Sequence, residues 1–225
     1  GVTKKPKLGC WEAHRFVAWH ARTQWQSRRN LVFEDDVEFL PCFTPAALLQ
    51  VHHHLLTKLP NDWDLYYLGH MPLYGCLPLG SSLWRVHSAM THAMIESDLF
   101  MDKLIASSYD AVARKNEGKE QQIDLWHMPW SKQYAISPIM AVQSNLNLPS
   151  DANKIGGIED WGIKFHASHP VMMEWIFMRG IFILIAILLL IALFWYFYRT
   201  PQTSSSSSTS ASNHSQPLAV GEETT

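Results

Sequence analysis

Three consecutive carboxylates, Glu34, Asp35 and Asp36, directly follow the short apolar run 31–33. Such a run predicts a buried strand. Burying three adjacent charges is very costly without a cation or hydrogen-bond donors, so the acids should lie where the strand leaves the core. Ligands bind at that edge of open α/β sheets, and clustered carboxylate oxygens suit Mg²⁺ or Mn²⁺, which can also bind a diphosphate. Taken alone, the triplet is better explained as an ordinary solvated turn, and the rest of the chain has to decide between the two.

The elements that would position this triplet alternate between helix and strand. Periodicity of the apolar residues predicts helices over 11–29, 45–58 and 99–115. Thr44 and Ser97 are expected to cap the second and third of these. Further strands are predicted over 63–68, 83–95 and, interrupted by Pro138, 134–143, whereas the Pro- and Gly-rich residues 71–82 predict a loop. The alternation favours an α/β sheet.

One segment near the C-terminus indicates a membrane protein. Residues 180–198 form an uncharged run between Arg179 and Arg199. As a helix, this run would extend roughly 28 Å, close to the hydrocarbon thickness of a bilayer. Aromatic residues at both ends are typical of membrane interfaces. We therefore predict a transmembrane helix with its flanks over 175–199, a disordered Ser/Thr-rich tail over 200–225, and one folded domain over 1–170.

The charge and the cysteine content argue against a basic nucleic-acid binder and against a fold held together by zinc or several disulfides. The chain has 225 residues, 47% of them hydrophobic, and a net charge of −2, so it is not a nucleic-acid binder built on bulk positive charge. Its three cysteines include no CxxC pair. Their spacing predicts neither a zinc site nor a disulfide framework, although it allows one bridge in an oxidising compartment.

Several short motifs, taken in order, resemble glycosyltransferase family 25, which holds lipopolysaccharide galactosyltransferases and the procollagen galactosyltransferase catalytic domains. Residues 9–14 are similar to the family's GC–SH opening, residues 31–39 to its acidic strand end, and residues 62–69 to its DWDLLYLG strand. The remaining similarities are at 92–95, 123–124, Pro138, Gln143 and 150–151. No single motif is specific to the family, so the resemblance rests on the occurrence of all of them in the family's order over 9–151.

The resemblance implies a GT-A-like nucleotide-sugar fold and an inverting transfer of galactose or glucose from a UDP-sugar. It also implies a divalent metal cofactor, usually Mn²⁺, with Mg²⁺ as the alternative. The acceptor would be a hydroxyl of a protein or glycan, collagen-like or lipopolysaccharide-like. With the predicted membrane span, the expectation is a single-pass glycosyltransferase of the endoplasmic reticulum or Golgi with a lumenal catalytic domain. Its partners would be the nucleotide sugar, the acceptor and the bilayer.

Site residues follow from the motifs and from the chemistry of sugar transfer. Alternate residues of a strand face the same side, so Asp36 is expected to bind the metal, assisted by Glu34 or Asp35. The acceptor hydroxyl needs a carboxylate base. Asp124, between two apolar neighbours, is the candidate, and a helix-capping role explains it equally well.

Two further residues are weaker candidates for cofactor binding. Asp64 lies within a predicted strand, where a structural role with a buried donor fits it better. His14 could contact the donor phosphate, and a packing role in the first helix explains it at least as well.

The chain departs from the family pattern in three places. Ala13 and Met94 replace a serine and a tyrosine of the family, and only eight residues precede Gly9, where the family has an earlier strand and helix that contribute to the nucleotide pocket. We therefore expect an N-terminally truncated domain. The second hypothesis is a catalytically inactive relative that acts as a membrane adhesion or interaction protein.

Overall fold

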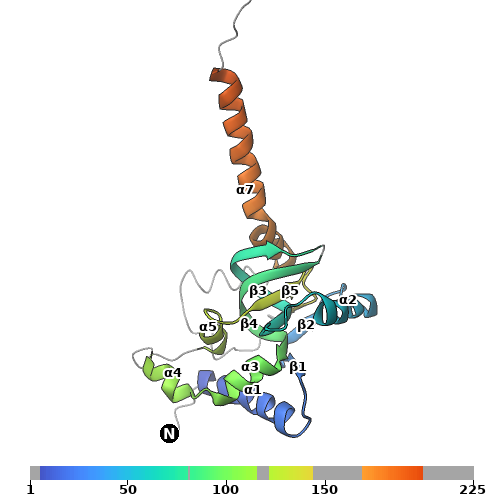
Figure 1. Cartoon of the computed structure of the whole chain (residues 1–225), viewed down its shortest axis with the longest axis vertical. Coiled ribbons are helices and arrows are strands. Elements are labelled where there is room, and N and C mark those ends of the chain that lie inside the picture. Colours follow the sequence, from blue (N-terminus) through green and yellow to red (C-terminus); the bar gives the residue numbers. More distant parts are fainter. Residues whose placement is uncertain (1–5, 81, 116–121, 144–168, 200–225) are drawn as a thin grey trace, which may run out of the picture. The chain divides into compact units, whose positions relative to one another are not determined.

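A computed structural model describes residues 6–80, 82–115, 122–143 and 169–199 (Figure 1). It divides into two units, Gly1–Leu184 and Ile185–Thr225. The described helices are α1 (Pro6–Thr23), α2 (Pro45–Thr57), α3 (Asp98–Ala106), α4 (Tyr109–Lys115), α5 (Ile123–His127) and α7 (Pro170–Arg199). The described strands are β1 (Arg29–Phe33), β2 (Val37–Phe39), β3 (Leu65–Pro78), β4 (Leu83–Ser97), β5 (Gln133–Ile136) and β6 (Ala141–Gln143).

The main sheet has four strands in the order β1-β4-β3-β5, and β2 and β6 form a separate antiparallel pair. In the main sheet, β3 and β5 are parallel, whereas β1–β4, β3–β4 and β4–β5 are antiparallel. The fold is therefore mixed α/β, as predicted, but its sheet is mostly antiparallel. The acids therefore do not lie at the common carboxyl edge of parallel strands, and their surroundings depend on the antiparallel register of β1 with β4.

The predicted loop over 71–82 is wrong. Strand β3 continues to Pro78, and its partner β4 begins at Leu83, so the two form one long hairpin. The register shifts between Pro72 and Tyr74 and again between Tyr74 and Leu77. Such bulges let a strand accommodate Pro and Gly without losing its pairing. Local composition therefore signalled a loop where tertiary pairing produces an irregular strand.

The two predicted helix caps are confirmed, whereas the predicted lengths of the first and third helices are wrong. Thr44 Oγ1 accepts a hydrogen bond from Ala47 N at 3.2 Å, and Ser97 Oγ accepts one from Phe100 N at 3.1 Å, so both predicted caps are confirmed. Helix α1 begins earlier than predicted and ends at Thr23 instead of 29. The third predicted helix is broken after Ala106 into α3 and α4.

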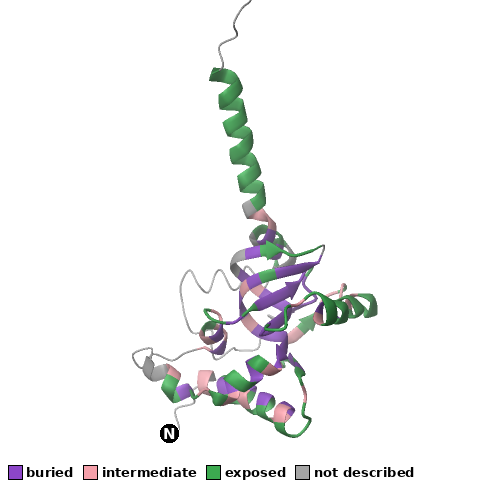
Figure 2. Ribbon diagram, viewed as in Figure 1, coloured by how far each residue is buried: buried purple, intermediate pink, exposed green. Residues whose placement is uncertain are grey.

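The two faces of the sheet bury separate hydrophobic clusters, because alternate strand residues point to opposite sides. One cluster combines sheet residues such as Leu65, Tyr67 and Met94 with side chains of α1, α3 and α5. The other combines Tyr66, Leu68 and neighbouring strand residues with side chains around α2. Buried residues accordingly follow the strands in Figure 2. Strand β1 is less covered than predicted, because Leu31 and Phe33 are exposed while Val32 is buried.

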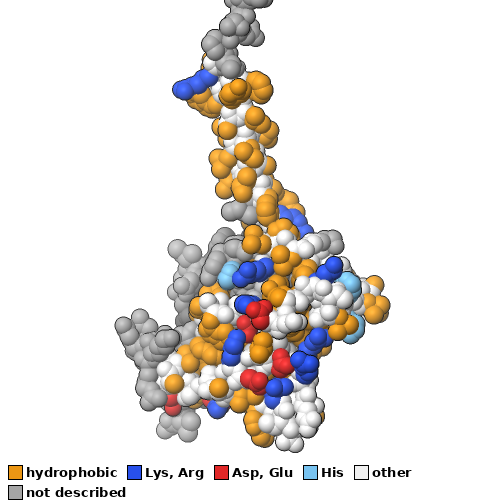
Figure 3. Space-filling view, in the orientation of Figure 1, with side chains coloured by type: hydrophobic (Ala, Val, Ile, Leu, Met, Phe, Trp, Pro, Cys, Tyr) orange, Lys and Arg blue, Asp and Glu red, His pale blue; other side chains and the backbone are white. Residues whose placement is uncertain are grey.

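Helix α7 contains the predicted membrane segment. Its residues Phe182–Arg199 form one helix long and apolar enough to cross a membrane, and none of that window is buried within the protein. Figure 3 shows the apolar side chains around this helix. The earlier turns belong to the first unit, where Glu174 Oε2 accepts a hydrogen bond from Ile139 N at 3.0 Å. The predicted tail over 200–225 lies outside the described residues.

Candidate functional site

The acidic triplet forms a tight turn between β1 and β2, directly after the strand as predicted. The strand alternation assumed for its three side chains does not apply to this turn. Glu34 N donates to His92 O at 3.0 Å, and Val37 N donates back to Glu34 O at 3.3 Å. Glu34 and Asp36 are partly buried, whereas Asp35 is exposed. The turn thus still directs the first and third carboxylates inward, as strand alternation predicted, but for a different geometric reason.

Glu34 joins helix α1 to strand β4. Its Oε1 accepts a hydrogen bond from the Thr91 hydroxyl at 2.5 Å and lies 3.1 Å from His14 Nε2. His14 is only 5% exposed. Burial by itself lowers the pKa of His14, but hydrogen bonds to Cys10 and Glu34 raise it to about 10. Burial acts to raise the pKa of Glu34, and its bonds to His14 and Thr91 outweigh that and lower it. The arrangement therefore favours an imidazolium–carboxylate pair.

Asp36 lies on the other side of the same turn. Its Oδ2 accepts a hydrogen bond from Gln143 Nε2 at 2.5 Å, while its Oδ1 is buried and has no hydrogen-bond partner among the described residues. The His92 side chain, 1% exposed, is close enough to both Glu34 and Asp36 for their charges to affect it. Burial lowers the pKa of His92, and the two carboxylates oppose this shift. A buried carboxylate oxygen without a protein donor is available to a water molecule or to a bound cation.

Gly69 allows this close packing. A Cβ at this position would lie 2.3 Å from Ala141 O and 2.5 Å from His92 Nε2. Because both distances are far below van der Waals contact, a glycine is needed where β3 passes the His92 ring and β6.

Asp124 reaches the same region from α5. Its Oδ2 accepts a hydrogen bond from Met90 N at 3.3 Å and its Oδ1 accepts one from Leu125 N at 2.9 Å. Burial raises the pKa of Asp124, these N–H groups lower it, and the charge of Glu34 raises it further. Met90 has φ 77°, a left-handed conformation that is unusual for a non-glycine residue. Such strain is often found at functional sites.

Asp64 is not part of this cluster. It precedes β3 at the Arg29–Ser97 end of the β1–β4 pair, whereas Glu34 follows the opposite end of β1. Its carboxylate is 1% exposed and accepts hydrogen bonds from Lys103 Nζ at 2.7 Å and from Lys132 N at 2.8 Å. These contacts support the structural role that the sequence already favoured for this residue.

Removing the Asp64 side chain should destabilise the fold. In Asp64→Ala, the Lys132 N–H loses its acceptor and Lys103 loses its buried partner, so the free energy of unfolding should fall by about 2–3 kcal/mol. Chemical denaturation of the full chain in detergent would measure the change. Asp62→Ala is the control, because its carboxylate pairs with Lys132 at the surface and should change stability little. Equal losses in the two variants would contradict the structural role of Asp64.

A second buried carboxylate, Glu96, lies on β4 and accepts a hydrogen bond from Asn30 Nδ2 at 3.0 Å. It is fully buried, and this burial raises its pKa to about 7, although the Asn30 hydrogen bond and the charge of His14 act to lower it. Because the pKa is higher in the folded protein than in the unfolded chain, the folded protein holds this proton more tightly. The stabilisation is complete below about pH 4.5 and is lost as the pH rises through 7.

We therefore expect Glu96→Gln to change the pH dependence of stability. A shift of this size corresponds to about 3 kcal/mol of stability lost by the parent between pH 4.5 and 8. The glutamine variant, which has no proton to lose, should lack this part of the decline. Denaturation at pH 5 and pH 8 would test it, with the exposed Glu38→Gln as control. A parallel pH dependence in parent and Glu96→Gln would contradict the prediction.

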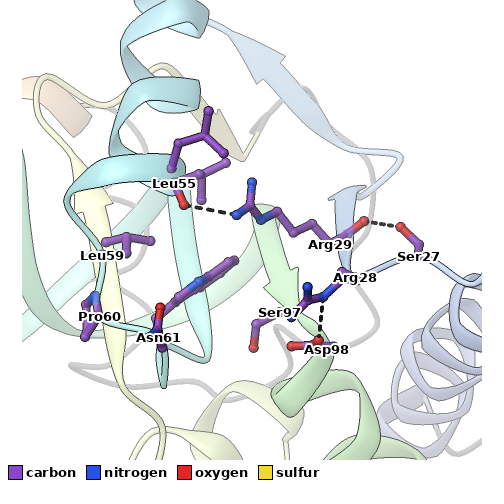
Figure 4. A pocket seen from close by; sticks show the side chains of 11 residues that line it. Ser27, Arg28, Arg29, Leu55, Leu59, Pro60, Asn61, Ser97 and Asp98 are labelled. Carbon is purple, nitrogen blue, oxygen red and sulfur yellow. Dashed lines mark hydrogen bonds and ion pairs between the residues drawn. The ribbon is translucent and has the colours of Figure 1, made fainter.

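A pocket of about 580 Å³ lies away from the acidic turn, at the other end of β1 (Figure 4). Its charged groups already have partners, since Arg28 Nε lies 3.3 Å from Asp98 Oδ2 and Arg29 donates to Leu55 O at 3.1 Å. Leu59, Trp63 and other residues of the α2–β3 connection complete its lining. The pocket contains none of the predicted site residues.

Comparison with known proteins gives no further assignment: no family model, no curated protein and no solved structure matches the chain. Of the predicted residues, the structure brings together His14, Glu34, Asp36 and Asp124, leaves Asp35 exposed on the turn, and places Asp64 elsewhere. Sequence reasoning missed Cys10, Met90 and Thr91, because only the register of β1 with β4 and the packing of α1 reveal their contacts.

Proposed function

We propose that this protein is a membrane-anchored, metal-dependent glycosyltransferase with a GT-A-like domain that transfers galactose or glucose from a UDP-sugar to a protein or glycan hydroxyl. One observation carries the proposal. Carboxylates and a histidine from three motifs far apart in the chain, at 14, 34–36 and 124, gather around the β4 residues Met90–His92. A chance acidic turn would not explain why Asp124 approaches it from a separate helix.

The residues present fit a hard divalent cation. The buried Oδ1 of Asp36 lacks a protein partner in the described part of the chain, and Asp35, the preceding residue, has an exposed carboxylate. Oxygen ligands of this kind suit Mn²⁺ or Mg²⁺. Asp36 would hold the ion with help from Asp35 or Glu34, and the bound ion would supply positive charge to a departing diphosphate.

Asp124 is proposed as the base that accepts the proton of the acceptor hydroxyl. Two backbone N–H groups, from Met90 and Leu125, fix the orientation of its carboxylate while leaving further lone pairs free. Its burial favours a carboxylate more basic than an ordinary aspartate, which strengthens proton abstraction. His14, held against Glu34 and hardly exposed, is better suited to orienting Glu34 than to contacting phosphate directly.

The anchoring part of the proposal rests on the apolar window Phe182–Arg199. We propose that it crosses a membrane of the endoplasmic reticulum or Golgi once, with the domain in the lumen. Protease protection in sealed microsomes tests this orientation. The domain should be resistant until detergent is added, whereas digestion in intact microsomes would contradict a lumenal domain.

A transfer assay tests the function. The full chain in detergent would be incubated with UDP-galactose or UDP-glucose, Mn²⁺ and either hydroxylysine-containing peptides or glycan acceptors. We expect sugar incorporation that is lost on adding EDTA. Calorimetry with UDP, with and without Mn²⁺, provides a second readout that needs no acceptor. Absence of both transfer and metal-dependent UDP binding would reject the proposal.

A second candidate is a catalytically inactive relative that acts in membrane adhesion or protein interaction. One observation favours it: within the described residues, β1 pairs only with β4, so its outer edge has no partner strand. Leu31 on that strand is 50% exposed. An open edge with apolar side chains is suited to pairing with another chain. Metal-dependent UDP binding would argue against this candidate.

A further inference from the structure

Cys10, His14 and Glu34 form a compact cluster with three different donor atoms. The sulfur, one ring nitrogen and one carboxylate oxygen all lie within 4.8 Å of one another. Cys10 and His14 are four residues apart on α1, which places them on the same helix face. Glu34 approaches that face from the end of β1, with Oε1 3.1 Å from His14 Nε2.

These separations are close to those of a tetrahedral metal site. With zinc–nitrogen and zinc–oxygen bonds near 2.1 Å, neighbouring donor atoms lie about 3.4 Å apart, and a sulfur donor lies slightly farther away. The largest separation between donor atoms in the cluster is at most 4.8 Å, and the pair from His14 and Glu34 is already at 3.1 Å.

The donor set also selects among metals. A thiolate and an imidazole favour Zn²⁺ and similar transition metals, whereas Mg²⁺ and Mn²⁺ prefer oxygen ligands. The Thr91 hydroxyl donates to Glu34 Oε1 at 2.5 Å, which holds that carboxylate in place as outer-shell partners of metal ligands do. Cys10 is exposed and His14 is buried, so one side of the cluster is open to solvent.

We propose that Cys10, His14 and Glu34 form a Zn²⁺ site with three protein ligands and a fourth position open to water or a small ligand. Binding needs a thiolate and a neutral imidazole, so it releases the thiol proton of Cys10 and one ring proton of the His14 imidazolium to solvent. This site differs from the proposed Asp36 metal site, because its specificity comes from sulfur and nitrogen donors that Asp36 and Asp35 do not offer. With Glu34 bound to this ion, Asp35 is the residue that assists Asp36. The cysteine spacing alone predicted no zinc site, because the other two ligands are not cysteines and one comes from a distant strand.

Cobalt substitution tests the site, because a thiolate bound to Co²⁺ gives a charge-transfer absorption in the near ultraviolet that oxygen ligands do not give. The full chain in detergent would be freed of metal and titrated with Co²⁺, and then with Zn²⁺ against a chromophoric chelator. We expect the thiolate band in the parent chain and its loss in Cys10→Ser. Zn²⁺ affinity should fall at least about 100-fold in Cys10→Ser and in His14→Gln.

The chain offers matched controls. Cys42→Ser removes a thiol that donates to Ile139 O and should keep both the band and the affinity. Because Cys10 is exposed, its replacement by serine should leave the fold intact, which circular dichroism checks. A parent chain without the thiolate band, or a band that persists in Cys10→Ser, overturns the proposal. The thiolate band is measured without UDP or an acceptor, and Cys10→Ser leaves the Asp36 carboxylate in place, so this site and the transferase proposal can fail separately.

Discussion

Replacing Asp36 with alanine is expected to lower UDP-sugar transfer by at least about 100-fold and to remove the Mn²⁺ dependence of UDP binding. The reason is geometric. Asp36 Oδ1 is buried and unpartnered in the described part of the chain, while Gln143 holds Oδ2 at 2.5 Å, so the carboxylate is positioned yet incompletely satisfied. Calorimetry of UDP binding with and without Mn²⁺, alongside a radiolabelled transfer assay, measures both effects.

Glu38→Ala is the matched control for Asp36→Ala. Glu38 is an exposed acid on β2, two residues beyond Asp36 in the chain, so its removal changes the net charge equally. It should leave transfer and UDP binding close to those of the parent. If Asp36→Ala transfers sugar as well as the parent does, Asp36 does not hold the metal.

Replacing Asp124 with asparagine is expected to lower kcat by about 10²–10⁴-fold while UDP binding changes little. Asparagine keeps the shape of the side chain and one oxygen acceptor for Met90 N or Leu125 N, but it cannot take the proton of an acceptor hydroxyl. The rate of the parent should fall as the pH decreases and Asp124 becomes protonated. Because burial raises the pKa of Asp124, the midpoint of this fall should lie at a higher pH than for an ordinary aspartate. That acid limb should be absent from the residual activity of Asp124→Asn.

The pH profile separates this catalytic role from a structural one. Asp110→Asn, an exposed aspartate of α4, serves as control and should keep both kcat and the acid limb. If Asp124→Asn retains the parent's rate, or loses UDP binding and stability together, then Asp124 supports the fold and is not the base. The hydrogen bond to the strained Met90 backbone would then be its main contribution.

Local signals predicted the fold where local interactions decide it. Thr44 and Ser97 cap their helices because each side chain bonds a backbone N–H three residues ahead, a contact that needs no distant partner. The continuation of β3 through Pro72 and Gly75 could not be predicted in this way. Its pairing partner lies across the hairpin, and the pairing outweighs the turn preference of individual residues.

In the candidate site, too, local features were predictable from the sequence and contacts between distant segments were not. The acidic triplet was recognised from residue type alone, but the shape of the turn that it forms follows from the hydrogen bond between Glu34 N and His92 O. In the antiparallel pairing of β1 with β4, Phe33 lies opposite Ala93, and this register places Thr91 beside Glu34. This register cannot be predicted from any short segment of the sequence, because the two strands are far apart in the chain.

By itself, the sequence determined the mixed α/β class, the helix caps, the apolar helix of α7 and the residue types from which a site could be built. These features depend on composition and on contacts a few residues apart. Only the tertiary structure decided which acids lie together, bringing Asp124 to the turn of Glu34 and Asp36 while pairing Asp64 with Lys103 elsewhere. The physical reason is that strand register and helix packing are set by burial summed over the whole domain, so the position of one carboxylate depends on contacts that its neighbours in sequence do not make.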